Sequence, residues 1–323
     1  MPTLSPIDET AMNPDTRSTP TQFLRCADGR LLAANWFEPE GPVRAVAVVS
    51  AATAVSRGFY RGFAQWLAGR GYAVLCYDYR GIGDSRDGPV RQERARLRDW
   101  ARLDMGAALH AAQRRRLTEQ QQQGCELGLL LIGHSFGGNA IGLVEGYERA
   151  DALLGVAAQA ADWRFWSGIA KAKAWLFFHA LLPVISHGLG HAPGWLLGAR
   201  AQGLPKGAAL EWARWGRRRG FMFSDPTLQA DLGYHRFAGP VHLWNVSDDH
   251  LFGPAPAVDE LARQFSTARV TRHTLTPEAL GLRQLGHFAM FRRELGEKIW
   301  PLLLGPVEAA TPVLAQAFKA RLG

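Results

Sequence analysis

A run of four apolar residues that leads directly into a Gly-x-Ser-x-Gly motif constrains this chain more than any other stretch. Residues 129–132 are Leu-Leu-Leu-Ile, the motif occupies residues 133–137, and a helix-compatible segment follows. A short continuous apolar run is typical of a strand buried on both faces. The chain must reverse within a few residues after this strand, so we expect a strained backbone at Ser135. Gly133 and Gly137 suit the turn because a Cβ there would collide where the helix lies back across the strand.

This arrangement makes Ser135 a candidate nucleophile. Its hydroxyl should project above the sheet, with the N-terminus of the following helix behind it to favour negative charge. Two backbone N–H groups should then bind an oxyanion. We expect one from Phe136, the residue after the nucleophile, and the other from the loop after the first buried strand, at Ala52 or its neighbour Ala51.

Strand-like and helix-like segments alternate on both sides of this motif. The predicted strands are two short ones around the Asp28-Gly29 turn, followed by residues 44–50, 72–77, 129–132, 152–158, 240–246 and 269–275. The predicted helices cover residues 59–69, 91–116, 136–149, 257–265 and 288–304, with a polar linker at 120–123 and a short tail helix after Thr311 that carries Leu314 and Phe318 on one side. This order predicts an α/β fold with a mostly parallel central sheet and helices on both faces.

The alternation stops near residue 161 and resumes near residue 239. The interval holds six of the eleven tryptophans, Gly and Pro punctuation, and no strand-like alternation. We therefore expect residues 161–235 to form a helical cap inserted into a core made of residues 21–160 and 236–323. Residues 1–20 contain Pro, Thr, Ser and acidic residues and are predicted to be a disordered tail. They have neither the basic nor the apolar region of a signal peptide.

The most apolar stretch of the chain lies in the predicted cap. Residues 174–182 suit a packed cap helix, and a role at a lipid surface is the alternative. His179, Pro183 and His187 interrupt the longer apolar stretch around it. We expect its longest clean piece to be too short to span a bilayer, so no stable membrane insertion is predicted.

A serine hydroxyl needs a base to take its proton and a third group to hold that base. For a nucleophile on a strand-to-helix elbow, the expected chain order is Ser, acid, His. His287 is the best candidate base, because it follows the last predicted strand and opens the final helix, at the same sheet edge as Ser135. His242 and His273 fall inside predicted strands and are expected to be ordinary strand side chains.

The candidate acid follows the strand that ends near residue 246. A carboxylate at that edge can reach the distal imidazole nitrogen. We favour Asp249, with Asp248 as the alternative acid, and whichever is spare is expected to cap a helix or loop. Asp162, just after the preceding strand, is a third possibility because it can reach the same position in space.

These motifs together resemble the α/β-hydrolase superfamily. The resemblance covers about residues 22–304 and rests on residues 133–138, residues 78–85 (Asp-Tyr-Arg-Gly-Ile-Gly-Asp-Ser), Asp248-Asp249 and Gly286-His287. Further stretches are similar to a group of bacterial predicted hydrolases related to the serine aminopeptidase and monoacylglycerol-lipase branches; they are residues 59–64, 211–215 and 285–292. Two features depart from the wider superfamily. Residues 50–53 (Ser-Ala-Ala-Thr) replace a common His-Gly, and the loop after Asp249 differs in length from the usual Asp-x-x-x-Pro.

The leading hypothesis is a serine hydrolase that cleaves a carboxylic ester with a small or apolar acyl or aryl group. An acyltransferase that uses the same residues, and a non-catalytic ligand-binding protein on a hydrolase scaffold, are the alternatives. We expect a small-molecule ester as partner and no cofactor. His187 and His191 are four residues apart, but nearby glycines and a proline oppose a helix that would align them on a metal.

Composition bounds the remaining possibilities. The formal net charge is +8, but Lys and Arg are scattered, and the Arg114–116 and Arg217–219 runs are expected to be solvated faces rather than a nucleic-acid surface. The three cysteines are widely spaced and suggest neither a disulfide framework nor a metal site. A cytoplasmic location is the resulting expectation, and the sequence leaves the oligomeric state open.

Overall fold

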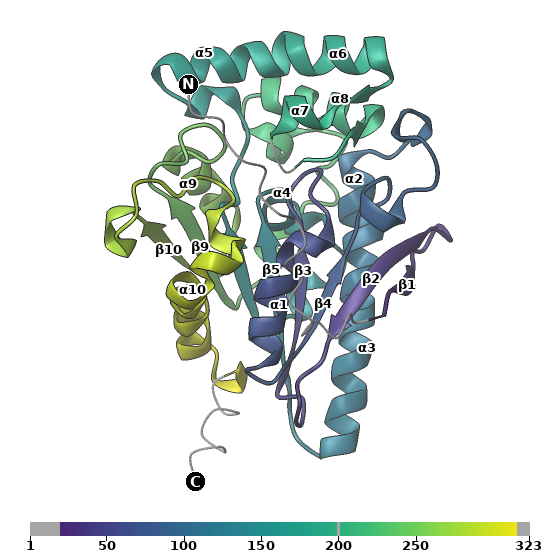
Figure 1. Cartoon of the computed structure of the whole chain (residues 1–323), viewed down its shortest axis with the longest axis vertical. Helices are drawn as coiled ribbons and strands as arrows, with labels where there is room; N and C mark the ends of the chain where they lie inside the picture. The colour runs from purple at the N-terminus through teal and green to yellow at the C-terminus, as the bar shows by residue number, and fades with distance from the viewer. Residues whose placement is uncertain (1–19, 199–200, 315–323) are drawn as a thin grey trace, which may run out of the picture.

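An eight-stranded sheet runs through the centre of the molecule (Figure 1). The computed structural model describes residues 20–198 and 201–314. The strand order is β1-β2-β4-β3-β5-β6-β9-β10. In chain order the strands are β1 (Gln22–Arg25), β2 (Leu31–Phe37), β3 (Ala45–Ser50), β4 (Tyr72–Tyr77), β5 (Gly128–His134), β6 (Ala152–Val156), β9 (Pro240–Val246) and β10 (Arg269–Leu275). Strands β1 and β2 form an antiparallel hairpin at one edge, and all pairs from β4 to β10 are parallel.

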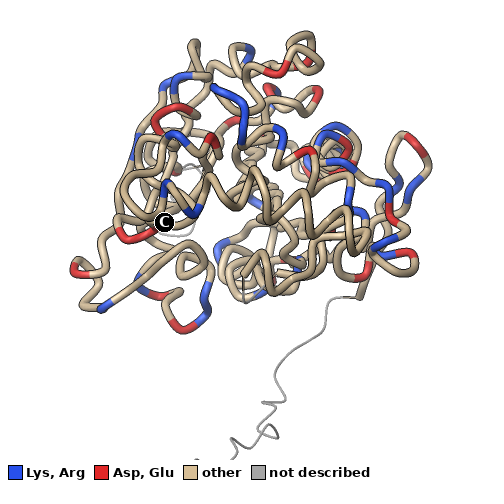
Figure 2. Tube along the Cα trace, turned by 90° about the horizontal axis from the view of Figure 1, so that it is seen from above, with Lys and Arg blue, Asp and Glu red and all other residues tan. Residues whose placement is uncertain are grey.

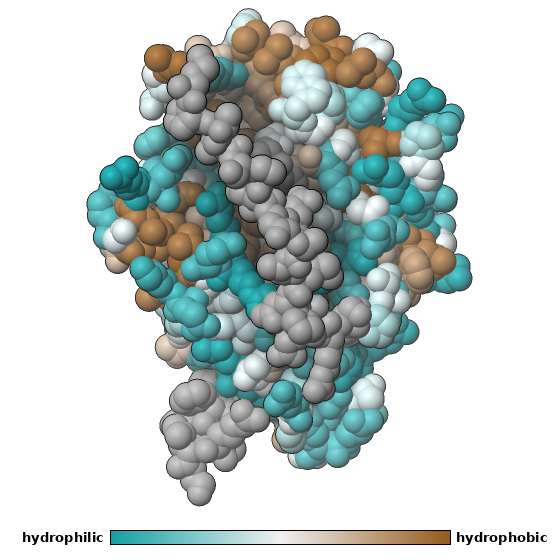
Figure 3. Space-filling model, viewed as in Figure 1, coloured by the Kyte–Doolittle hydropathy of each residue, from teal (hydrophilic) through white to brown (hydrophobic). Residues whose placement is uncertain are grey.

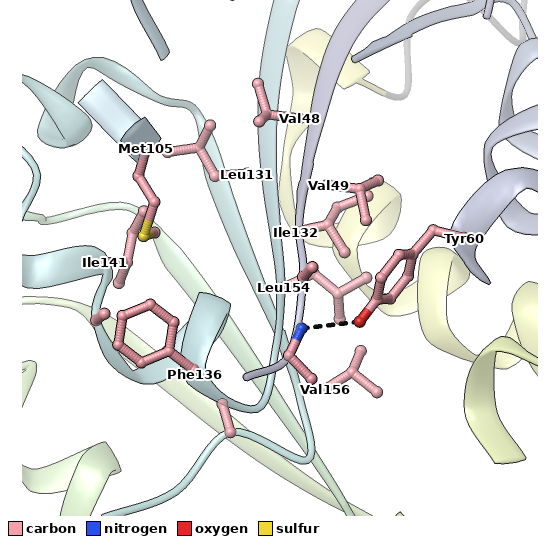
Figure 4. Packing of buried hydrophobic residues seen from close by; sticks show 14 of the residues in the cluster. Val48, Val49, Tyr60, Met105, Leu131, Ile132, Phe136, Ile141, Leu154 and Val156 are labelled. Carbon is pink, nitrogen blue, oxygen red and sulfur yellow. Dashed lines mark hydrogen bonds between the residues drawn. The ribbon is translucent and has the colours of Figure 1, made fainter. Parts of the chain in front are cut away.

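The central strand β5 explains why the apolar run before the motif is unbroken. Every residue of β5 is buried, with β3 on one side and β6 on the other. The register pairs Ser50 with Gly133 and Gly133 with Gly155, so the carboxyl ends of the three strands meet at one edge of the sheet. Aliphatic side chains of these strands pack against Tyr60 and Phe136 (Figure 4).

Helices cover both faces of the sheet. Helices α1 (Arg61–Ala68) and α10 (Gly296–Ala310) contact each other and the sheet, and α9 (Ala255–Gln264) packs against β9. Helix α3 (Gly106–Gln123) packs on β3, β4 and β5. Charged residues of both signs lie around the outline of the molecule (Figure 2).

Two predicted helices differ from those observed. Residues 120–123 are the last turn of α3 rather than a linker, because glutamine is a good helix former and Gly124 ends the helix with a left-handed backbone, φ +66°. The helix after the motif is only α4 (Phe136–Asn139), followed by 3-10 turns rather than a helix to residue 149. Tyr234 ends it, since its hydroxyl donates to the Asn139 carbonyl and its ring lies against Gly142.

The helices predicted at residues 91–116 and 288–304 begin later in the structure than predicted. A short helix α2 (Leu97–Asp99) and a π turn lead into α3 without a break, so the first helical residue is Leu97. Two 3-10 turns precede α10, which begins at Gly296 instead of residue 288. The predicted tail, apart from Pro20, and Phe318 of the predicted tail helix lie outside the described residues.

The interval between β6 and β9 lies over the carboxyl edge of the sheet (Figure 1). It contains α5 (Gly168–Leu176), α6 (Leu182–Leu189), α7 (Gly194–Leu197) and α8 (Lys206–Arg217). A short two-stranded ribbon, β7 (His191–Ala192) with β8 (Leu204–Pro205), is an addition that the sequence pattern did not predict.

The apolar stretch of this interval forms one helix from Gly168 to Leu189, which is longer than the uninterrupted apolar piece that was expected to be too short to span a bilayer. Its length and composition suffice to cross a membrane, with 17% of its apolar window buried. The helix continues through Pro183 because it widens to a π turn (Phe177–Leu181) immediately before it. His179 supports this turn through a hydrogen bond of 2.9 Å between its Nδ1 and the Trp175 carbonyl.

Candidate functional site

Ser135 occupies a strained turn between β5 and α4. Its φ is +50° and its ψ is −112°, a conformation that is uncommon for a residue with a side chain. The turn is tight because a Cβ on Gly133 would lie 2.3 Å from the Cα of Gly138, and one on Gly137 would lie 2.2 Å from the Ser50 carbonyl oxygen. The expected need for glycine at both positions is therefore confirmed by the close backbone approach.

The two carboxylates after β9 face different partners. One oxygen of Asp249 lies 2.6 Å from Nδ1 of His287, and its other oxygen accepts from the N–H of Phe252 at 3.1 Å. Asp248 instead accepts the N–H groups of Leu285 and Gly286, both at 2.9 Å. The Asp248 carboxylate thus holds the loop that carries His287, and the Asp249 carboxylate orients its imidazole.

Asp162, the third candidate acid, belongs to another network. It accepts the N–H groups of Arg164 and Gly220, at 3.1 and 3.0 Å, and pairs with the Arg164 guanidinium. These contacts join the segment after β6 to the loop after α8. The structure therefore brings Asp249, and neither Asp162 nor Asp248, into contact with the imidazole of His287.

The structure corrects the prediction that the Ala52 N–H is an oxyanion donor. The N–H of Ala52 donates to the phenolic oxygen of Tyr60 at 2.8 Å, so it is not free to bind a substrate oxygen (Figure 4). The carbonyl of the neighbouring Ala51 accepts from Gly137 and from the Tyr79 hydroxyl. Thr53, the next residue, lines the same cavity as Ser135. In the described part of the chain, neither the Thr53 N–H nor the Phe136 N–H has a hydrogen-bond partner.

A buried chain of hydrogen bonds joins the three loops at this edge. The Tyr60 hydroxyl contacts Nδ1 of His134 at 2.8 Å, and Nε2 of His134 contacts the His287 carbonyl oxygen at 3.1 Å. Because a carbonyl only accepts, Nε2 carries the proton and Nδ1 accepts from Tyr60. Burial, and the nearby imidazole of His287, hold the pKa of His134 well below its ordinary value.

Sequence reasoning did not assign roles to Tyr60 and His134. His134 is the first of the two variable residues of the Gly-x-Ser-x-Gly motif, and Tyr60 lies in a segment that was expected to be an ordinary helix. A polar residue buried directly before the nucleophile was the available signal, because such a residue requires partners.

Ser135 and His287 both line a cavity of about 310 Å³ between the sheet edge and the interval. Its walls are largely aliphatic and aromatic, and include Trp166, Phe177, Leu197, Trp212, Leu251, Phe252 and Phe288. Polar side chains are few, with Gln159 and Thr53 near the sheet and Lys173 on α5. A cavity of this size and lining suits a mostly apolar small molecule.

In the part of the chain that the structure describes, no group of three or more His, Cys, Asp or Glu side chains is arranged to hold a metal ion. His187 lies in the last turn of α6 and His191 begins β7, with Gly190 in a left-handed conformation between them.

Comparison by sequence identifies a matching family. A sequence model described as the alpha/beta hydrolase family matches residues 46–295. No curated protein matches the chain by sequence.

Several solved structures share the fold. A soluble variant of monoglyceride lipase from Saccharomyces cerevisiae has a TM-score of 0.63 at 12% identity, over 92% of this chain and 96% of that one. An esterase from Pyrococcus furiosus has a TM-score of 0.57 at 16% identity, over 91% of each chain. An esterase from Exiguobacterium antarcticum has a TM-score of 0.53 at 18% identity, over 88% of this chain and 98% of that one.

Proposed function

The chain belongs to the alpha/beta hydrolase family, and we propose that it is a serine hydrolase that cleaves a carboxylic ester through an acyl-enzyme. One observation carries this proposal: Ser135, on its strained turn, and His287, held by Asp249, open onto the same apolar cavity. The three residues come in the order nucleophile, acid, base, which suits an elbow between strand and helix.

Each group has a defined role in the proposed reaction. The Ser135 oxygen attacks the acyl carbon while Nε2 of His287 takes its proton, and the Asp249 carboxylate stabilises the imidazolium that forms. The C–O bond to the alcohol then breaks, and His287 returns the proton to the leaving oxygen. Water, activated by the same imidazole, hydrolyses the acyl-enzyme and releases the acid.

The N–H groups of Phe136 and Thr53 are the proposed donors to the oxyanion. Both lack a partner within the described residues, and they flank Ser135 from the loops after β5 and β3. Donors that are already oriented stabilise the negative charge of the tetrahedral intermediate at no cost of reorganisation. Thr53 replaces Ala52 in this role, because the Ala52 N–H is bound to Tyr60.

Helices α5 to α8 are the proposed cap over this site. Their side chains supply much of the cavity wall, including Phe177 from the π turn after α5 and Trp212 from α8. An apolar cap excludes bulk water and favours an apolar acyl or aryl group over a charged one. The proposed substrate is therefore a small-molecule ester whose acyl or aryl group fits about 310 Å³.

A panel of p-nitrophenyl esters of increasing acyl length tests this function. We expect kcat/KM to rise with chain length until the cavity is filled and then to fall, and Ser135→Ala to abolish turnover. Added alcohols at increasing concentration separate hydrolysis from acyl transfer through the products formed. Equal turnover by wild type and Ser135→Ala, or no turnover of any ester, would contradict the proposal.

A further inference from the structure

The helix from Gly168 to Leu189, which we call the cap helix, and the adjoining α7 carry most of the large apolar side chains that are exposed in the described part of the chain. Seven of the twelve large apolar side chains exposed in the described part of the chain lie within residues 168–195. They are Ile169, Trp175, Leu176, Leu181, Val184, Leu189 and Trp195, and we call them the outer cap face. Figure 3 shows this apolar area over α5 and α6. Soluble proteins rarely leave so contiguous an apolar area without a partner.

The opposite side of the same helix packs inside the protein from Phe178 onward. Phe178 and Leu182 are buried, and the Phe178 ring packs directly against Gly216 of α8. The helix also carries Lys171 and Lys173, whose charges would be costly at the centre of a bilayer. One face of this helix packs on the protein, and its other face carries apolar side chains together with lysines. Such a helix lies along a membrane surface rather than across the membrane.

The charge of the segment specifies the kind of surface. Residues 163–210 contain Lys and Arg but no Asp or Glu, although the chain as a whole has 29 acidic residues. Lys171 and Lys173 have no acidic partner among the described residues. The Lys171 ammonium and the Arg164 guanidinium both lie over the Trp163 ring, and Arg164 donates to the carbonyl of the exposed Arg217. Such a patch is attracted to a surface that carries negative charge.

The outer cap face is continuous with the mouth of the cavity. Four exposed side chains also line the cavity. They are Leu176, Leu181 and Lys173 on the cap helix, and Leu251 in the loop after β9. An apolar substrate could pass from a lipid layer to Ser135 along these side chains without crossing bulk water. A second protein bound there would cover the mouth, which favours a lipid surface as the occupant.

We propose that the outer cap face docks on the surface of a bilayer that contains anionic phospholipid. Its apolar side chains enter the interface, and Lys171 and Lys173 contact the headgroup phosphates. This inference goes beyond the proposed function and needs no turnover.

Flotation of the full-length chain with phospholipid vesicles tests the docking. The Ser135→Ala variant is used, with vesicles of phosphatidylcholine alone or with 30% phosphatidylglycerol, so that the result is independent of catalysis. We expect binding to the anionic vesicles, weaker binding to the neutral ones, and a loss of the difference at high salt, where the Debye length falls to about 3 Å. Binding to neither kind of vesicle would overturn the proposal.

Paired variants locate the contact. Lys171→Glu with Lys173→Glu should weaken binding to anionic vesicles at least tenfold, since each basic residue near such a surface contributes about fivefold. Val184→Asp should weaken it about tenfold through the lost apolar contact. Lys298→Glu on α10 is the control for the lysine variants, and Leu117→Asp on α3 is the control for Val184→Asp. Both residues are exposed outside the cap, and both changes should leave vesicle binding unchanged.

Two further outcomes would also overturn the docking. The first is an equal loss of vesicle binding in the control variants. The second is a stable dimer in sedimentation that Val184→Asp dissociates while vesicle binding stays unchanged, which would assign the outer cap face to a second copy of the chain. Thermal unfolding of every variant shows that a loss of binding does not reflect a loss of fold.

Discussion

Asp248 and Asp249 are adjacent in the sequence, yet their carboxylates contact different parts of the His287 loop. Asp249 meets the imidazole itself at 2.6 Å, whereas Asp248 accepts two backbone N–H groups just before it. The first contact fixes the tautomer and direction of the ring, and the second fixes the loop. Replacing either residue by asparagine separates these two roles, because asparagine keeps the size but loses the charge and half of the acceptors.

We predict that Asp249→Asn lowers kcat by about 10³- to 10⁴-fold with little change in KM or in stability, because the imidazole loses its orientation and its counter-charge. Asp248→Asn should instead cost about 1–3 kcal/mol of stability through an unsatisfied N–H and reduce kcat far less. Steady-state kinetics and chemical denaturation of both variants measure the split. The reverse pattern would make Asp248 the acid.

His134 gives the protein a dependence of stability on pH. Burial keeps its pKa well below 6.5 in the folded state, so the folded chain holds it neutral while the unfolded chain takes up a proton below that pH. The unfolded state thus binds more protons, and the stability contributed by this group is present above pH 6.5 and lost as the pH falls. The slope is about 1.4 kcal/mol per pH unit for one proton.

Between pH 6.5 and 5, the free energy of unfolding of the wild type should fall as the pH falls. We predict that in His134→Gln this fall is less steep, by about 1.4 kcal/mol per pH unit. Glutamine can still donate to the His287 carbonyl and accept from Tyr60, so the variant should fold. His110→Gln, at an exposed position on α3, is the control and should keep the wild-type slope. Parallel slopes for wild type and His134→Gln would show that His134 does not carry this dependence.

At the scale of elements, the cavity depends on how closely α8 approaches the cap helix. Gly216 of α8 permits this approach, since a Cβ there would lie 2.5 Å from the ring of Phe178, which lines the cavity. Phe178 also packs edge-on against Trp212, with ring centroids 5.8 Å apart. The shape of the cavity is therefore set by a glycine that does not line it.

Gly216→Ala should destabilise the protein by about 1–2 kcal/mol, because overpacking outweighs the gain in helix propensity. Displacement of Phe178 should also raise KM for the longest esters more than for the shortest. Gly188→Ala is the matched control on α6, where an added Cβ meets no atom within 4 Å and should stabilise by about 0.5–1 kcal/mol. A Gly216→Ala variant as stable as this control would contradict the packing argument.

Residues 72–77, 240–246 and 269–275 are strands with the predicted bounds. The first is buried throughout and reads as an unbroken apolar run, whereas the last is a mostly exposed edge strand that was recognised by its β-branched residues Val270, Thr271 and Thr274. The errors arise where a distant residue decides the local structure. Tyr234 ends the helix after the motif, and Tyr60 occupies the Ala52 N–H. No local pattern reveals such partners, whereas the positions of Ser135 and His287 on turns after strands are themselves local.

At the scale of the whole molecule, two surfaces meet above the sheet. The carboxyl edge collects Ser135, Asp249 and His287 from loops far apart in the chain, as expected for a parallel sheet. The interval covers this edge, with an apolar inner side toward the cavity and the outer cap face toward solvent. On the proposed function, chemistry and access to substrate are thus assigned to different segments of the chain.

The location of a fluorophosphonate adduct tests the central claim most directly, because such a probe captures only an activated hydroxyl. Intact-mass measurement followed by peptide mapping of the wild type, Ser135→Ala and Asp249→Asn gives the site and the rate of labelling. We predict one adduct per chain on Ser135, slower labelling of Asp249→Asn, and none at this site in Ser135→Ala. No adduct on the wild type, or an adduct that forms at the same rate in Ser135→Ala, would contradict the account.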